Sequence, residues 1–167
     1  ISVALAAYNG EKFIEKQLES LRGQTLPPDE VIICDDRSTD KTVEICRKFI
    51  EKNKLPDWKV EINSENLGYC RNFYKAIEKT NGDLIFLCDQ DDEWDENKLA
   101  VMAEIMEKHP QLRMLSCRYR LINGAGAPAE GVRVPHYEPL FDGKLQTVTA
   151  ESLIGHSYIR GCSSCFK

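Results

Sequence analysis

Short apolar runs alternate with segments of helical periodicity four times in the first 108 residues of this 167-residue chain. Apolar residues spaced three or four apart follow each run, as in 11–22 and 96–108. This alternation is typical of βαβ units, in which parallel strands form one sheet and right-handed crossover helices cover it. We therefore predict an α/β protein with a mainly parallel sheet flanked by helices. The four predicted strands are 2–7, 31–34, 59–62 and 83–88.

The last third of the chain has weaker patterns. A fifth strand is predicted within 113–121, a long surface loop over 123–139, a short helix at 149–154 and a last strand at 160–166. The length fits one domain, residues 1–167, with a core of its own. Because the chain begins inside a strand pattern and ends just after an apolar segment, we expect a fragment truncated at its C-terminus.

The charge balance and the cysteines limit the classes of function. A net charge of -5, with acidic and basic residues interspersed, argues against a partner that is a nucleic acid. Seven cysteines, an odd number, without a signal peptide or glycosylation sequon, favour a cytoplasmic location. No apolar run is long enough to cross a bilayer, so we expect membrane association only through segments outside this chain, at the inner face of the membrane in the full-length protein.

Carboxylates follow two of the predicted strands at the point where each strand ends. Asp35 and Asp36 follow the second strand, and three aspartates occupy four positions, 89–92, after the fourth. Ligands of such sheets bind beyond the carboxyl ends of the strands. Crowded carboxylates repel one another unless a cation compensates, so a divalent metal, Mn²⁺ or Mg²⁺, is expected at 89–92. The alternative is a solvated acidic turn that caps the next helix through Asp95.

Two common nucleotide-binding motifs are absent from the sequence. The first strand lacks the Gly-x-Gly-x-x-Gly pattern of dinucleotide sites, and there is no Gly-Lys-Ser/Thr loop of an ATPase. The predicted edge instead offers an acidic pair for a base or ribose and a metal-type acidic cluster for a diphosphate. A nucleoside diphosphate held at both ends fits this arrangement.

Four motifs lie at 3–10, 31–42, 66–69 and 87–94. They occur in the order and spacing of the family 2 glycosyltransferases, and the chain resembles that family over nearly its whole length. The resemblance implies an inverting enzyme of the GT-A fold, of which this chain is the nucleotide-sugar-binding part. The Asp-Gln-Asp-Asp-x-Trp form resembles the rhamnosyltransferase-like members. The implied partners are a nucleoside-diphosphate sugar donor of UDP or dTDP type and a glycan or lipid-linked acceptor, as in cell-surface polysaccharide synthesis.

The resemblance also implies roles for individual residues. Asp91 would be the direct metal ligand, and Asp89 would contact the ribose or a metal-bound water. Asp92 would be a supporting or helix-capping residue. Arg71 would reach the diphosphate, although a solvated helix residue is an equal alternative. The implied nucleotide-binding residues are Ala7 and Tyr8 for the base, Asp36 for the base or ribose with Asp35 beside it, and Asn66, Gly68, Arg71 and Asp89; the implied metal ligands are Asp89 and Asp91.

No catalytic base is identified in the sequence. In the resembled family the base follows the segment similar to 161–166, and this chain ends at Lys167. Glu151 and His156 lie nearest in sequence but outside the family's motif, so we interpret them as surface or packing residues. We expect the chain to bind nucleotide and to transfer little or no sugar.

Two other classes of protein remain as alternatives. A sugar nucleotidyltransferase shares carboxylates at strand ends, but would carry a Gly-rich basic loop where this chain has Tyr8-Asn9-Gly10. A receiver-like signalling module also binds Mg²⁺, but places its acidic pair after the first strand. The Cys162-x-x-Cys165 spacing is interpreted as core cysteines, because no second pair with zinc-site spacing exists.

Overall fold

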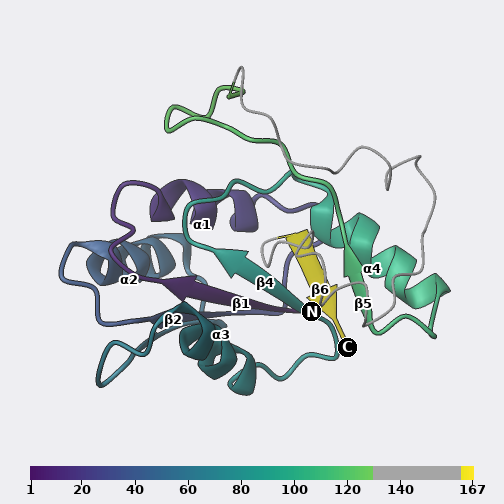
Figure 1. The fold of residues 1–167 in the computed structure, drawn as a ribbon, viewed down its shortest axis with the longest axis horizontal. Coiled ribbons are helices and arrows are strands. Elements are labelled where there is room, and N and C mark those ends of the chain that lie inside the picture. The colour runs from purple at the N-terminus through teal and green to yellow at the C-terminus, as the bar shows by residue number, and fades with distance from the viewer. Residues whose placement is uncertain (130–162) are drawn as a thin grey trace.

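The structure is a computed structural model that describes residues 1–129 and 163–167 (Figure 1). The predicted helix at 149–154, most of the predicted loop at 123–139, and Glu151, His156 and Cys162 lie outside the described residues. The described elements, in chain order, are β1 (Ser2–Ala7), α1 (Ile14–Arg22), β2 (Glu30–Asp35), α2 (Thr42–Asn53), β3 (Trp58–Ile62), α3 (Tyr69–Glu78), β4 (Ile85–Asp89), α4 (Lys98–Lys108), β5 (Met114–Ser116) and β6 (Ser164–Phe166).

One sheet with the strand order β3-β2-β1-β4-β6-β5 joins these strands. β1 pairs in parallel with both β2 and β4, and β2 pairs in parallel with β3. β6 is antiparallel to β4 and to β5. The prediction of an α/β fold with a mainly parallel sheet is therefore confirmed. The continuous apolar sequence of β1 follows from its place inside the sheet, where helices cover both faces.

The helices divide unequally between the two faces of the sheet (Figure 1). α1, α2 and α4 bury Leu18, Phe49 and Met102 against one face, in the larger apolar core. α3 packs Ala76 against the other face, over Ala4 and Ile32. Burying one such large apolar side chain is worth about 1.5–3 kcal/mol, so the three-helix face supplies most of the driving force.

Two helices begin later than the sequence predicts. Residues 11–13 form a turn in which Phe13 N–H and Ile14 N–H both donate to Gly10 C=O, so α1 begins at Ile14. α4 begins at Lys98 because the Gln24 side chain, from the loop after α1, accepts a hydrogen bond from Leu99 N–H. Such capping from a distant segment leaves no local signal in the sequence.

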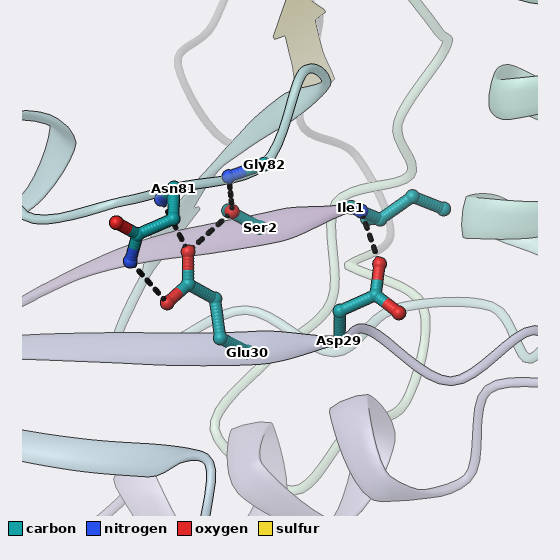
Figure 2. Close-up of polar contacts among 6 residues, drawn as sticks. All are labelled: Ile1, Ser2, Asp29, Glu30, Asn81 and Gly82. Carbon is teal, nitrogen blue, oxygen red and sulfur yellow. Dashed lines mark hydrogen bonds and ion pairs between the residues drawn. The ribbon is translucent and has the colours of Figure 1, made fainter.

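Glu30 holds the amino ends of three chain segments together (Figure 2). Its carboxylate accepts hydrogen bonds from the Ser2 hydroxyl at 2.7 Å and from the backbone and side chain of Asn81 at 2.5 and 3.1 Å. Gly82 N–H donates to the Ser2 hydroxyl at 2.8 Å. Burial alone would raise the pKa of Glu30, but the bonds from Ser2 and Asn81 outweigh it and lower that pKa below its usual value.

None of the helices in the described part of the chain is long and apolar enough to cross a membrane.

Candidate functional site

The strand order marks one edge of the sheet as the place for a ligand. β1 lies between β2 and β4, so the chain leaves β1 in one direction and returns on its other side. Such a switch point opens a crevice beyond the carboxyl ends of the strands. The register brings the last residues of these strands together, since Ala7 pairs with Asp35 and Ala6 pairs with Asp89. The structure therefore places the predicted residues of three strand ends at a common edge.

The loops that follow β1 and β2 are joined by reciprocal hydrogen bonds. Asn9 N–H donates to the Ser38 hydroxyl at 2.8 Å, and the Asn9 side-chain oxygen accepts from Thr39 N–H at 2.8 Å. Gly10 N–H donates to the Thr42 hydroxyl at 2.8 Å. Asn9 has φ of 49°, a conformation that Asn adopts more readily than most residues. Together these contacts hold the first two loops of the edge in one arrangement.

The carboxylate of Asp36 is directed at the third loop of this edge. Asp36 is 2% exposed and accepts hydrogen bonds from Asn63 Nδ2 at 2.7 Å and from the N–H groups of Leu67 and Gly68 at 2.8 Å each. The Asn66 side chain donates to Asp36 C=O at 3.1 Å. Asp36 thus fastens residues 66–68, which the sequence singled out without indicating what would hold them.

Asp35 is equally buried, but it faces the loop that follows its own strand. It is 1% exposed, and its two oxygens accept from the backbone N–H and the hydroxyl of Ser38 at 2.9 and 2.5 Å. The period of two along β2 explains the difference, because Asp35 shares the face of Val31 and Ile33 whereas Asp36 turns toward α3. The acidic pair predicted from sequence therefore holds two separate loops.

A buried pair of amides connects the third loop to the sheet. Asn63 Nδ2 also donates to Asn72 Oδ1 at 2.9 Å, and Asn72 Nδ2 donates to Cys34 C=O at 2.8 Å. Gly68 has φ of 78°, which an L side chain rarely adopts, and α3 begins directly after it. Arg71 is exposed on the first turn of α3. Sequence analysis missed Asn63 and Asn72, because their hydrogen bonds to Asp36 and Cys34 join segments that are far apart in the chain.

The acidic turn after β4 is anchored to the core by the tryptophan that ends it. Trp94 is 7% exposed, and its ring lies 6.1 Å from the ring of Phe86, centroid to centroid. Lys98 Nζ lies 3.5 Å from the centroid of the Trp94 ring, a cation–π contact. Asp89 is half-buried and Asp91 is exposed. Trp94 thus fixes the end of the turn while the Asp91 side chain stays accessible.

A small cavity of about 170 Å³ adjoins Asp91. Phe13 and Lys16 line it from the α1 side, and residues 122–124 line it from the hairpin closed by the bridge between Ile122 and Pro128. A larger cavity, of about 260 Å³, lies at the opposite edge around Glu30. We place the functional site at the edge formed by the carboxyl ends of the strands (the carboxyl edge) despite the size difference, because the switch point of the sheet, between β2 and β4, lies there.

The residues at this edge fit a metal ion that arrives with a substrate. Within 1–129 and 163–167, no three His, Cys, Asp or Glu side chains converge as a ready-made metal cage. Mg²⁺ in nucleotide sites is commonly held by one or two carboxylates, with substrate phosphates and water at its other positions. The half-buried Asp89 and the accessible Asp91, two residues apart, match that donor set.

Fold and site together define a Rossmann-like α/β domain with a ligand-binding edge at β1 and β4. The family described as Glycosyl transferase family 2 matches residues 2–147. The chain therefore belongs to glycosyl transferase family 2, and its fold is the GT-A fold of its structural neighbours.

Three proteins illustrate the similarity. Poly(ribitol-phosphate) beta-N-acetylglucosaminyltransferase TarS of Staphylococcus aureus is 33% identical over 129 residues, covering 76% of this chain and 22% of TarS. A crystal structure of TarS in complex with UDP matches with a TM-score of 0.66 and 32% identity, covering 77% of this chain and 38% of that one. The dTDP-rhamnosyl transferase RfbG of Shigella flexneri is 36% identical over 99 residues, covering 57% of this chain and 34% of RfbG.

The third protein is the mannosyltransferase PcManGT from Pyrobaculum calidifontis, whose solved structure is a complex with GDP-Man and Mn²⁺. It has a TM-score of 0.67 and 25% identity, covering 71% of this chain and 35% of that one. This chain therefore spans between about a fifth and two fifths of the length of these relatives.

Proposed function

We propose that this chain is the donor-binding domain of an inverting glycosyltransferase that acts in cell-surface polysaccharide synthesis. The observation that carries the proposal is the carboxyl edge. There the ends of β1, β2 and β4 and the 66–68 loop come together and are joined by hydrogen bonds. Solved relatives are complexes with UDP, with UDP-GlcNAc and with GDP-Man and Mn²⁺. Each of these ligands is a nucleoside diphosphate or its sugar derivative, the class of ligand that the sequence predicts.

We assign the two ends of the donor to opposite ends of this edge. The base would lie against Ala7 and the half-exposed ring of Tyr8, near Asp35 and Asp36. Asp36 would contact the nucleoside from the floor of the site and hold Asn66 and Gly68 in place. A UDP or dTDP donor is the proposal, because TarS binds UDP and RfbG is a dTDP-rhamnosyl transferase.

The diphosphate would lie toward the acidic turn. Asp91, with Asp89 beside it, would hold a divalent metal, and Arg71 at the start of α3 would approach the phosphates. A bound divalent metal supplies Lewis-acid stabilisation of negative charge on a leaving diphosphate. Trp94 and Phe86 keep the turn in place against the core, so the carboxylates need little reorganisation during the reaction.

In the proposed reaction an acceptor hydroxyl attacks C1 of the donor sugar from the face opposite the diphosphate. The new C1–O bond forms as the bond between C1 and the diphosphate oxygen breaks, and the hydroxyl proton passes to a general base. We assign no general base among the described residues. The acceptor is proposed to be a glycan or a lipid-linked glycan. The cysteines in the described part of the chain are free thiols, which favours a cytoplasmic location.

A thermal-shift experiment tests the proposal. UDP, dTDP and GDP are added to the protein with and without Mn²⁺, and unfolding is followed by tryptophan fluorescence. A ligand at about 100 times its Kd stabilises by about 2.7 kcal/mol, or about 5–11 °C for a domain of this size. We expect a metal-dependent shift with a pyrimidine diphosphate that is lost in Asp91→Ala and kept in the matched control Asp83→Ala, at the exposed opposite edge. An equal shift in both variants would remove Asp91 from the site.

A further inference from the structure

Gln90 lies between Asp89 and Asp91 in the acidic turn, and its neutral amide is a weaker metal ligand than a carboxylate. Its side-chain amide instead makes two hydrogen bonds to one residue of another loop. Gln90 Oε1 accepts from Tyr8 N–H at 2.6 Å, and Gln90 Nε2 donates to Tyr8 C=O at 2.9 Å. The turn after β4 is thereby clamped to the turn after β1, although the two residues are 82 positions apart in sequence.

The clamp continues the β1–β4 ladder past its end. β1 and β4 lie next to each other in the sheet (Figure 1). Their parallel register ends at the pair Ala6 and Asp89. Beyond that point the Gln90 amide offers one donor and one acceptor to the backbone of Tyr8, as a peptide group would. A carboxylate has only acceptors and an ammonium group has only donors, so neither reproduces this pair.

Gly10 provides an independent sign that this position is built for the glutamine. A Cβ added to Gly10 would lie 2.4 Å from Gln90 Oε1 and 2.5 Å from its Cδ. Such distances are far inside van der Waals contact, so any larger residue at position 10 would displace the amide. The absence of a side chain at Gly10 therefore leaves the room that the Gln90 amide occupies.

We propose that Gln90 is a positioning residue that sets the distance between the metal end and the base end of the donor site. The inference rests on the proposed function, in which Asp89 and Asp91 hold the metal and Tyr8 meets the base. Tyr8 is 48% exposed, and the clamp on its backbone holds this residue at the edge. A donor that must reach both ends binds best when their spacing is set before it arrives.

Hydrogen exchange tests the clamp without any ligand. Gln90→Met keeps most of the side-chain volume and removes both hydrogen bonds, and Gln111→Met makes the same change at an exposed position after α4. In the unsubstituted protein we expect the Tyr8 amide to be protected. In Gln90→Met it should exchange at least about tenfold faster, because both hydrogen bonds to the Tyr8 backbone are lost, while the Leu5 amide inside β1 is unchanged. Unchanged Tyr8 exchange in Gln90→Met would overturn the clamp.

Calorimetry with UDP and with dTDP, each with and without Mn²⁺, tests the positioning role. A residue that only supports the fold would weaken binding equally in both conditions. We expect Gln90→Met to lower the affinity about five- to tenfold with Mn²⁺ and distinctly less without it, so that the gain in affinity due to Mn²⁺ shrinks. The same gain in Gln90→Met as in Gln111→Met would overturn the positioning role.

A double substitution checks the contact from the other side. Gly10→Ala should lower both Tm and the Mn²⁺-dependent gain, and adding Gln90→Ala to it should recover part of the Tm because the truncated side chain no longer meets the new methyl group. Strictly additive losses of Tm would argue against the contact. If the unsubstituted protein bound no nucleoside diphosphate at all, the proposed function would fail and the positioning role with it, whereas the Tyr8 exchange rate would still decide whether the clamp exists.

Discussion

Removal of the Asp36 carboxylate is the most direct test of how the ligand edge is held together. Asp36 is buried and accepts three hydrogen bonds, from Asn63, Leu67 and Gly68, at 2.7–2.8 Å. Each of these hydrogen bonds contributes about 1 kcal/mol net, because water can partly replace the Asp36 carboxylate at the more exposed end of the 66–68 loop once that carboxylate is removed. Asp36→Ala should therefore lower the free energy of unfolding by about 3 kcal/mol, equivalent to about 6–12 °C in Tm.

Asp36→Asn separates the contributions of the two oxygens. One oxygen accepts from Asn63 and Leu67 and the other accepts from Gly68 alone. An asparagine keeps the first oxygen and turns an amino group toward Gly68 N–H, so we expect a smaller loss, about 1–2 kcal/mol. The Leu67 amide should remain protected from exchange in Asp36→Asn and lose protection in Asp36→Ala.

Urea unfolding followed by tryptophan fluorescence measures these differences. Asp83→Ala is the matched control, because Asp83 is exposed at the opposite edge of the same sheet. An exposed substitution of this kind changes stability by no more than about 0.5 kcal/mol. If Asp36→Ala unfolded at the same urea concentration as Asp83→Ala, the network around residues 63–68 would not contribute to stability and the reasoning would be refuted.

Two further predictions concern acid stability and the thiols. The hydrogen bonds from Ser2 and Asn81 depress the pKa of Glu30 in the folded state, so its contribution is fully present above its unfolded pKa near 4.5 and is lost as pH falls through the folded value. The difference in unfolding free energy between the unsubstituted protein and Glu30→Gln should shrink as pH is lowered below about 4.5, and a constant difference down to pH 3 would contradict this. Among the described cysteines, Cys70 is exposed and should react first with a thiol reagent at pH 8. Burial raises the pKa of the Cys34 thiol to about 11 and that of Cys46 to about 12, so these thiols should react only on unfolding; equal rates for Cys34, Cys46 and Cys70, measured by mass spectrometry, would contradict the described burial.

Local patterns in the sequence were enough to predict the class of fold. An apolar run such as 31–34 is buried on both sides wherever it lies inside a sheet, and the spacing of Ile14, Leu18 and Leu21 gives one buried helix face in any packing. These features depend on neighbours within a few residues. The succession of strands and helices along the chain, the mainly parallel sheet and the location of the polar turns were therefore predictable. Small errors appeared where a distant side chain sets a helix end, as Gln24 does for α4.

The hydrogen-bond partners at the ligand edge depend on tertiary structure. Sequence reasoning treated Asp35 and Asp36 as one acidic pair, whereas the alternation of faces along β2 sends them to different loops. Gln90 and Tyr8 become partners only because β1 and β4 are adjacent in the sheet. The residue types and their order along the chain thus determined which chemical groups reach the edge. The order of the strands within the sheet and their register decided which groups meet. A hydrogen bond requires two atoms within about 3 Å of each other, and separation in sequence does not determine that distance.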